Sequence, residues 1–391
     1  MSQRLQKIFA LAAIALLALN LRTAVSSISP VVSFIQQDID LPIVTIGLLG
    51  IAAPLAFALA TSLSYRPARR FGVELTLIFV VLAIVGGHLI RALAWDSTAL
   101  FFGSMLSLLG TGVGNVLLPV LVRKYFSNRI GLISAMYITM TSVSATIGSL
   151  FAVPVAQAAG WRLSLGQWAL LAVLTLVPLL AIRKNSSPEP KPPRASGRRA
   201  IWRSPTALAI AGAQAMTSVF GYVSFAWLPI LLIEHNGVSE LQAGSLLALF
   251  AIMGFPVSIL VPQLAQRFPK LQAKIVYLSA IMGVTGPLGL LLFDDPVWLW
   301  VIAIGLGPTM FPLALTLMNL RSRSQDVVLS VSAFGQGVSY TIATIAVMAV
   351  GITRELTGGW EPTLWILLIT AALSLLAGLQ LRRGAMVDDE L

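Results

Sequence analysis

Long apolar runs alternate with short polar segments along the whole chain of 391 residues. A helix that crosses a bilayer needs about 20 mainly apolar residues, and twelve runs meet that requirement. They lie near residues 8–35, 44–64, 75–95, 99–122, 130–155, 164–182, 205–233, 241–262, 274–293, 297–320, 327–351 and 362–381. The pattern predicts an all-α membrane protein with twelve transmembrane helices.

The longest polar segment divides these runs into two groups of six. It reads "RKNSSPEPKPPRASGRRAIWR" over residues 183–203, and its proline and charge content predicts a flexible or extended linker. Landmarks recur in the two groups at nearly constant spacing, which is typical of transporters with two parallel halves around a central cavity. The pairs are Pro119 and Pro312, 193 residues apart, and Gly160-Trp161 with Gly359-Trp360 and Pro30 with Pro229, each 199 apart. We therefore expect an N-terminal six-helix half at 1–182, a cytoplasmic linker at 183–204 and a C-terminal six-helix half at 205–391.

The composition supports a membrane protein, because 57% of the residues are hydrophobic and only 10% are charged, against about 25% charged in soluble domains. The net charge of +11 comes from short basic clusters between the apolar runs. That distribution is typical of cytoplasmic loops and not of a nucleic-acid-binding surface. With both termini cytoplasmic, most lysines and arginines fall on inner segments. We expect a multi-pass protein of the inner (plasma) membrane whose partners are a small molecule and the lipid bilayer, with no nucleic acid.

Several kinds of chemistry find no support in the sequence. There is no cysteine, so disulfides and thiolate catalysis are excluded. His88 and His235 are far apart and lack the spacing of metal ligands. The motifs GxSxG, HExxH and the P-loop are absent, as are paired carboxylates in the middle of the runs. We expect a protein that is not an enzyme and that needs no metal or cofactor.

The layout of six runs, a basic central segment and six more runs resembles the major facilitator superfamily over the whole chain. The segment "YRPARRFG" (65–72) is similar to the basic loop motif of that family in its Arg69-Arg70-x-Gly72 end, but it lacks the usual aspartate and the leading glycine. Two further motifs, "LNLR" in the first run and "GNVLLPVLVRKYF" (114–126) in the fourth, resemble the cyanate permease and nitroimidazole transporter branch. The resemblance implies a major facilitator fold, alternating access, a monomer, and a cyanate-like anion or nitro-heterocycle as substrate.

Arg22 lies in the middle of the first run, about 14 residues or 21 Å from its cytoplasmic start. A guanidinium at the centre of a span costs about 2.5–3.5 kcal/mol on insertion scales, and neither interface is within easy reach. None of the fifteen acidic residues falls inside a run, so the sequence offers Arg22 no buried counter-ion. We expect Arg22 to face the cavity and hold an anionic substrate by charge-assisted hydrogen bonds. The alternative is a structural arginine bonded to backbone carbonyls.

Uncharged polar residues near the middle of the runs are further candidates for substrate binding. In the superfamily that the chain resembles, spans one, four, seven and ten line the cavity, with contributions from two, five, eight and eleven. The candidates are Asn20, Asn115, Tyr137, Gln214, Tyr222, Gln336 and Tyr340. Asn20 should point to a helix sector about 200° from that of Arg22, whereas Gln336 and Tyr340 share one helical face. For each residue the alternative is a hydrogen bond between helices, worth about 0.6 kcal/mol on average.

His88 is the only histidine in the middle of a run. It is a candidate for proton coupling, because imidazole titrates near neutral pH. Span three is peripheral in the superfamily, so the alternative is a hydrogen bond that serves packing. Arg91 lies one turn nearer the outside, and we expect its long side chain to reach the membrane interface.

Other functions remain open on the sequence alone. A drug or metabolite exporter with a planar apolar substrate would use an aromatic lining and leave Arg22 structural; its candidates are Phe220, Tyr222, Phe225, Trp227 and Phe334. A receptor or scaffold on the same fold would bind without flux, and no appended sensor domain supports that function. A channel is disfavoured, because duplicated halves around one central charge suit a carrier.

Overall fold

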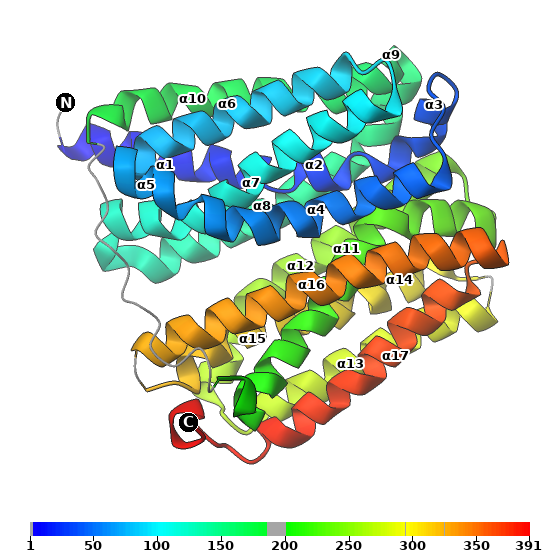
Figure 1. Ribbon diagram of the computed structural model, residues 1–391. Coiled ribbons are helices and arrows are strands. Elements are labelled where there is room, and N and C mark those ends of the chain that lie inside the picture. Colours follow the sequence, from blue (N-terminus) through cyan, green and yellow to red (C-terminus); the bar gives the residue numbers. More distant parts are fainter. Residues whose placement is uncertain (1–2, 186–200, 294, 324) are drawn as a thin grey trace. The chain divides into compact units, whose positions relative to one another are not determined.

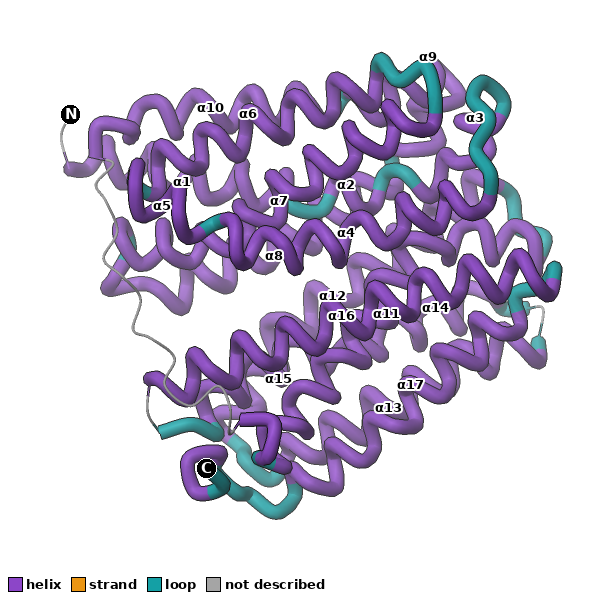
Figure 2. Tube along the Cα trace, in the orientation of Figure 1, coloured by secondary structure: helices purple, strands orange, loops and turns teal. Residues whose placement is uncertain are grey.

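The computed structural model describes residues 3–185, 201–293, 295–323 and 325–391, and in this part of the chain helices are joined by short loops without any strand (Figures 1 and 2). The longer helices of the N-terminal half are α1 (Gln3–Asn20), α4 (Ile43–Leu63), α5 (Tyr65–Phe71), α6 (Val73–Ala92), α7 (Ser97–Tyr125), α8 (Ile130–Leu150), α9 (Ala152–Gly166) and α10 (Trp168–Ile182). Those of the C-terminal half are α11 (Pro205–Asn236), α12 (Glu240–Arg267), α13 (Leu271–Leu292), α14 (Val297–Leu306), α15 (Met310–Leu320), α16 (Gln325–Thr357) and α17 (Glu361–Leu381).

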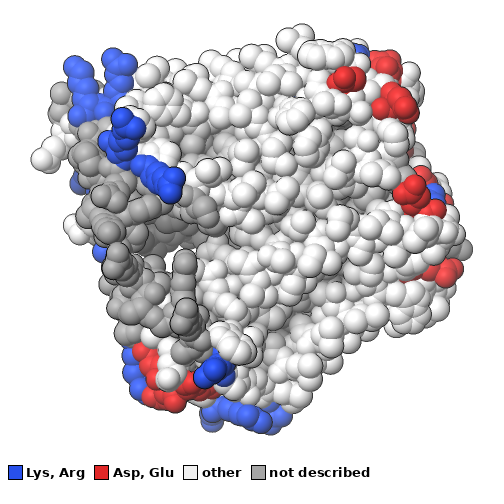
Figure 3. Space-filling model, viewed as in Figure 1, with Lys and Arg blue, Asp and Glu red and all other residues white. Residues whose placement is uncertain are grey.

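The expectation of an all-α membrane fold with twelve spans is confirmed. Eleven helical segments of the described residues are long and apolar enough to cross a membrane, and α4 carries a further, shorter apolar stretch at Val44–Ala60. On the face that Figure 3 shows, charged side chains gather at the helix ends and the flank between them is uncharged. A surface that contacts the hydrocarbon of a bilayer must be uncharged, because a charged side chain there is costly.

The chain divides into two compact units. The first contains residues 1–191 with 225–230 and 238–248, and the second contains residues 192–224, 231–237 and 249–391. Most of the predicted linker at 183–204 lies outside the described residues, which resume with a short 3-10 helix at Ile201–Arg203. The division into halves at 1–182 and 205–391 therefore stays a prediction.

The first membrane span is broken near its middle. Helix α1 ends at Asn20, and the chain continues as the four-residue helix α2 (Thr23–Ser26), the 3-10 turn η1 (Ser29–Val31) and α3 (Val32–Gln36). Pro30 lies in η1, where it has no N–H to donate to a continuing helix. Thr23 Oγ1 donates to Asn20 O and Ser26 Oγ to Arg22 O, local bonds that compete with a regular helix. The apolar pattern predicts one uninterrupted run at 8–35, so the break departs from it.

Glycines bring α6 and α7 close together in the first unit. A Cβ on Gly87 would lie 2.5 Å from the backbone nitrogen of Ser107, and one on Gly110 would lie 2.8 Å from the Ile84 side chain. Inside a membrane such close packing drives helix association, because lipid chains are as apolar as the side chains that they would replace. Helix α7 also packs against α1 and α2, so these glycines help to set the surroundings of the broken span.

A Gly-Trp turn ends the fifth span of the first unit. Gly160, within α9, has φ +84°, a left-handed conformation that favours glycine. The next residue, Trp161, donates from Nε1 to Asp38 Oδ2 at 2.9 Å, and Arg162 Nη1 pairs with the same oxygen at 2.6 Å. These bonds hold the pKa of the Asp38 carboxyl below its ordinary value. The carboxylate that follows the first span is thereby tied to the turn between the fifth and sixth spans.

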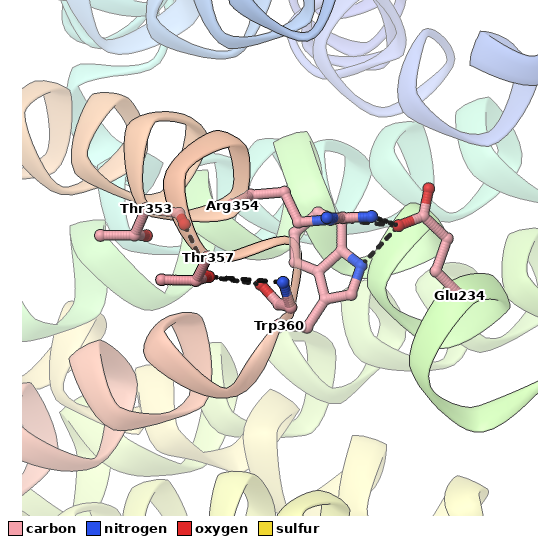
Figure 4. Close-up of polar contacts among 6 residues, drawn as sticks. Glu234, Thr353, Arg354, Thr357 and Trp360 are labelled. Carbon is pink, nitrogen blue, oxygen red and sulfur yellow. Dashed lines mark hydrogen bonds and ion pairs between the residues drawn. The ribbon is translucent and has the colours of Figure 1, made fainter.

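The second unit repeats this contact, as Figure 4 shows. Glu234, near the end of α11, accepts from Trp360 Nε1 at 2.8 Å and pairs with the guanidinium of Arg354 on α16. Trp360 lies two residues after Gly358, which is left-handed with φ +69°, whereas the left-handed Gly160 directly precedes Trp161 in the first unit. An acid, a tryptophan and an arginine therefore meet at corresponding places in both units, which supports the internal duplication indicated by the sequence.

A second pair of corresponding contacts joins the spans at their other ends. Glu74, completely buried in the first turn of α6, pairs with Lys124 Nζ at 2.7 Å and accepts from Tyr125 Oη at 2.8 Å at the end of α7. In the second unit, Gln272 near the start of α13 accepts from Arg321 Nη2 at 2.6 Å just beyond α15. The second unit thus uses a neutral amide in the place where the first unit uses a carboxylate.

Candidate functional site

Arg22 lies at the break in the first span, and Ser144 of α8 bridges that break. The backbone N–H of Arg22 donates to Ser144 Oγ at 3.0 Å, and Ser144 Oγ donates to Leu19 O at 2.6 Å. Helix ends leave backbone N–H and C=O groups without partners, which is costly where water is excluded. One hydroxyl satisfies a group on each side of the break and so makes the interrupted helix tolerable inside the membrane.

Gly148, one turn along α8 from Ser144, allows this close contact. A Cβ at Gly148 would lie 2.1 Å from Ser26 Oγ and 3.2 Å from the Cα of Thr23. Any side chain at this position would push α2 away from α8. The segment that begins at Arg22 is therefore held against α8 by a hydrogen bond at one turn and by direct packing at the next.

Arg22 is half-buried, and its contact with the described part of the protein leaves the guanidinium nitrogens without a bonding partner. Its Cζ lies 5.4 Å from the centroid of the Phe57 ring on α4, within the range of a cation–π interaction. In the described part of the chain we find no hydrogen bond or ion pair made by the guanidinium nitrogens. An arginine carries five N–H donors, and those of Arg22 remain available to a bound molecule.

Asn20 faces away from Arg22, as its helical position predicts. Its Nδ2 donates to Leu16 O at 2.8 Å and to Thr175 Oγ1 of α10 at 3.0 Å, and its side chain is completely buried. The amide therefore joins α1 to α10, which is the structural alternative considered above. A substrate-binding role for Asn20 stays a prediction that this geometry does not favour.

Asn115 and Tyr137 lie in the first unit as Arg22 does. Asn115 is half-buried on α7 beside Gly114, whose Cβ position would lie 3.2 Å from the Leu21 side chain. It therefore sits at the level of the helix break. Tyr137 is half-buried on α8 and packs against the apolar core of α1, α6 and α7.

The polar candidates of the second unit gather where α11 meets α16. Tyr222 and Tyr340 pack edge to face with ring centroids 6.1 Å apart. Gln214 is buried, and the Cβ position of Gly335 on α16 would lie 3.0 Å from its Oε1. Gln336 is half-buried and donates to Ser332 Oγ at 3.2 Å within its own helix. The structure thus brings together three of the four candidates of this unit across one helix contact.

A pair of serines completes this contact, and of the two Ser218 is not singled out by the sequence pattern. Ser218 Oγ hydrogen-bonds Ser339 Oγ, which also donates to Gln214 O at 3.4 Å. Ser144, Gly148 and Phe57 likewise escape the sequence argument. The only signal available for the first two is the small, hydroxyl-rich stretch "MTSVSATIGS" (140–149) in the fifth span.

His88 and Arg91 are completely buried on α6. His88 Nδ1 lies 3.2 Å from Leu165 O, and Arg91 Nη1 donates to Ala24 O at 3.3 Å. The expectation that Arg91 reaches the membrane interface is wrong, because its side chain turns inward to the end of α2. Helix α2 stops at Ser26, so its last carbonyls accept bonds from side chains.

Comparisons with known proteins agree with the fold. The Major Facilitator Superfamily model matches residues 14–344. The chain is 33% identical over 385 residues to the 2-nitroimidazole transporter of Escherichia coli (strain K12), covering 95% of both chains. It is 31% identical over 381 residues to the uncharacterized transporter YycB of Bacillus subtilis (strain 168), covering 95% of this chain and 92% of that one. It is 26% identical over 361 residues to the cyanate transport protein CynX of Escherichia coli (strain K12), covering 88% and 90%.

Two solved structures share this fold at low sequence identity. One is a bacterial homolog of the human lysosomal transporter Spinster in an inward-facing and unoccupied conformation, with a TM-score of 0.73, 17% identity and coverage of 97% of this chain and 98% of that one. The other is a D-xylose-proton symporter, with a TM-score of 0.73, 13% identity and coverage of 98% and 99%.

Proposed function

Since the chain belongs to the major facilitator superfamily and is a membrane transporter, we propose that it moves a small anionic or polar solute by alternating access, with Arg22 as the central binding charge. The solute class that we propose is a cyanate-like anion or a nitro-substituted heterocycle. We orient the protein in the inner membrane with both termini in the cytoplasm, because lysine and arginine cluster in the segments that this orientation places inside.

The names of two relatives define the chemistry that the site should accept. They are a 2-nitroimidazole transporter and a cyanate transport protein. Cyanate is a monovalent anion, and a nitro group is planar with two oxygens that carry partial negative charge. Guanidinium offers a planar fork of N–H donors that suits charged and planar acceptors alike. One arginine in an apolar setting is therefore a reasonable common recognition element.

The observation that carries this proposal is the state of Arg22 at the helix break. Ser144 satisfies the backbone there, so the guanidinium is not needed to bond the interrupted helix. The guanidinium of Arg22 lies over the face of the Phe57 ring. None of the ion pairs in the described part of the chain includes Arg22. A cation inside a membrane protein that lacks a protein counter-ion favours an anionic ligand.

We assign supporting roles to the remaining candidates. Phe57 fixes the guanidinium by its ring face and leaves the N–H edges for the solute. Asn115 and Tyr137 supply neutral hydrogen-bonding groups from the first unit. In the second unit, Gln214, Tyr222, Gln336 and Tyr340 are the candidates for solute binding.

Direction and coupling follow from the charge of the solute. Carrying a monovalent anion into a negative-inside cell costs about 2.3 kcal/mol per 100 mV. Uptake therefore requires a co-transported cation or an exchanged anion, whereas export of the anion runs downhill. For uptake we propose three alternative routes for the proton: His88, a protonated solute or a water path.

The exporter alternative rests on an aromatic lining, and two of its residues are used for packing. Phe220 and Trp227 are completely buried, and Phe220 lies against Gly283 and Gly307 within the second unit. Packing thus occupies two of the aromatic candidates, whereas the guanidinium of Arg22 stays available to a solute. This contrast favours the anion transporter over the exporter.

Flux into proteoliposomes tests the proposal. We expect the wild-type protein to transport cyanate or 2-nitroimidazole. This flux should be lost in Arg22→Gln and partly retained in Arg22→Lys. Arg162→Lys, at an exposed ion pair, is the matched control and should transport normally. Normal flux through Arg22→Gln would remove Arg22 from the site and favour the exporter.

A further inference from the structure

Arg91 is a second buried cation in the first unit, and the proposed transport function does not use it. Its side chain is completely buried in the last turn of α6. An arginine near the end of a span normally extends to the interface, where its charge is hydrated. Arg91 instead turns towards the protein, and its Nη1 donates to Ala24 O at 3.3 Å.

The other edge of the Arg91 guanidinium has no partner in the described part of the chain. Nε and Nη2 are both buried and make no hydrogen bond there. These two nitrogens share the edge of the planar group opposite Nη1, and their N–H bonds run nearly parallel. That edge is the one that pairs with two oxygens of a carboxylate or a similar planar oxyanion.

No carboxylate of the described chain neutralises this charge. The four ion pairs found there join other residues: Lys124 with Glu74, Arg162 with Asp38, Arg323 with Asp389 and Arg354 with Glu234. Burying a charged group without a counter-charge is strongly unfavourable. A single carbonyl oxygen at 3.3 Å compensates only part of that penalty.

Two further polar atoms without partners occur beside the residues that Arg91 joins. Ser27, three residues after Ala24, is completely buried and its Oγ makes no hydrogen bond in the described part of the chain. His88, one turn before Arg91 on the same face of α6, binds Leu165 O through Nδ1 and leaves Nε2 without a partner there. Buried polar atoms without partners therefore occur just after α2 and one turn before Arg91 on α6, in the two segments that Arg91 joins.

We propose that the Nε–Nη2 edge of Arg91 is a binding site for a small planar monovalent oxyanion, such as formate, nitrite, nitrate or bicarbonate, inside the first unit. This site is distinct from that of Arg22, because the Arg22 guanidinium lies against the Phe57 ring of α4 whereas the completely buried Arg91 guanidinium bonds Ala24 O. An anion held there neutralises the buried charge and links α6 to the segment that follows the helix break. Its occupancy therefore stabilises the folded first unit.

Thermal unfolding of the purified full-length protein in an Arg22→Gln background tests this site without interference from the transport site. Formate, nitrite and nitrate are titrated at constant ionic strength, with chloride as the spherical control. We expect saturable stabilisation by the planar anions in Arg22→Gln. Adding Arg91→Lys keeps the charge but removes the fork, so the apparent affinity for planar anions should fall about tenfold and their advantage over chloride should disappear. The matched control, Arg22→Gln with Arg162→Lys, should behave like Arg22→Gln alone.

Two results would overturn the proposal. One is an absence of anion-dependent stabilisation in Arg22→Gln, a measurement that does not depend on whether the Arg91 variant folds. The other is an identical response of the two proteins with and without Arg91→Lys, which would show that the effect does not depend on the guanidinium fork of Arg91. The proposed function is judged separately by flux through Arg22→Gln, so either idea can fail alone.

Discussion

Ser144 accepts the backbone N–H of Arg22 at 3.0 Å and donates to Leu19 O at 2.6 Å, so one side chain of the fifth span closes the gap in the first. The guanidinium of Arg22 is thereby released from bonding the backbone. This separation of roles is the physical basis of the proposed site. The serine hydroxyl satisfies the backbone groups at the helix break, and the arginine side chain remains free to bind a solute.

Ser144→Ala should destabilise the protein and weaken solute binding together. Removing the hydroxyl leaves the Arg22 N–H and the Leu19 carbonyl without their partner, which should lower the free energy of unfolding by about 1–2 kcal/mol. Ser144→Thr keeps the hydroxyl and is the matched control. Thermal unfolding and solute affinity should be measured on both variants, and an Ala variant as stable as Thr would contradict the bridging role.

Gly148→Ala should also disturb the break, but by overpacking. The new Cβ would lie 2.1 Å from Ser26 Oγ, so α2 and α8 must separate at a cost of about 1–3 kcal/mol. Gly212→Ala in α11 is the control, because nothing lies within 4 Å of its Cβ position; replacing this helical glycine should be neutral or stabilise by about 0.5–1 kcal/mol. Equal melting temperatures for the two alanine variants would argue against close α2–α8 contact.

Asn20→Ala should affect stability and leave solute affinity nearly unchanged. Its Nδ2 bonds Thr175 Oγ1 across α1 and α10, and hydrogen bonds of this kind contribute about 0.6–1.7 kcal/mol in membrane proteins. A double-mutant cycle with Thr175→Val should show coupling of that size. A loss of affinity as large as that of Arg22→Gln would instead return Asn20 to the substrate site.

Stability should fall in acid partly through Asp38. The hydrogen bonds from Trp161 and Arg162 lower the pKa of Asp38 in the folded protein. A carboxyl with a lowered pKa stabilises the fold above its unfolded pKa, near 3.9, and this contribution is lost as the pH falls through the folded pKa. The difference in melting temperature between wild type and Asp38→Asn should therefore shrink as the solution is acidified. A difference that grows in acid would contradict the assignment.

The sequence predicts the twelve spans well, because the bilayer imposes a length and an apolar composition on each of them. It also predicts the duplication, since Gly160-Trp161 and Gly359-Trp360 occupy turns in which an acid and an arginine meet the tryptophan in each unit. The contact partners Asp38 and Glu234 could not be inferred, because they lie over 100 residues from the tryptophans that they bind.

The break in the first span could not be predicted for a related reason. Residues 20–22 contain neither glycine nor proline, and the hydroxyl that stabilises the break comes from Ser144, 122 residues from Arg22 in sequence. The inward direction of the Arg91 side chain could not be predicted from the sequence either. Its place near the end of a span favours extension to the interface, but the carbonyl of Ala24, freed where α2 ends, attracts it inward.

Equilibrium binding of cyanate and 2-nitroimidazole to purified wild type, Arg22→Gln and Arg22→Lys is the most direct test of the central claim. If Arg22 is the solute-binding charge, affinity for at least one of these solutes should fall about 30-fold in the glutamine variant, equivalent to about 2 kcal/mol. The lysine variant should lie between the two, because it retains the charge without the fork. A well-folded Arg22→Gln protein that binds both solutes as tightly as wild type would contradict the account.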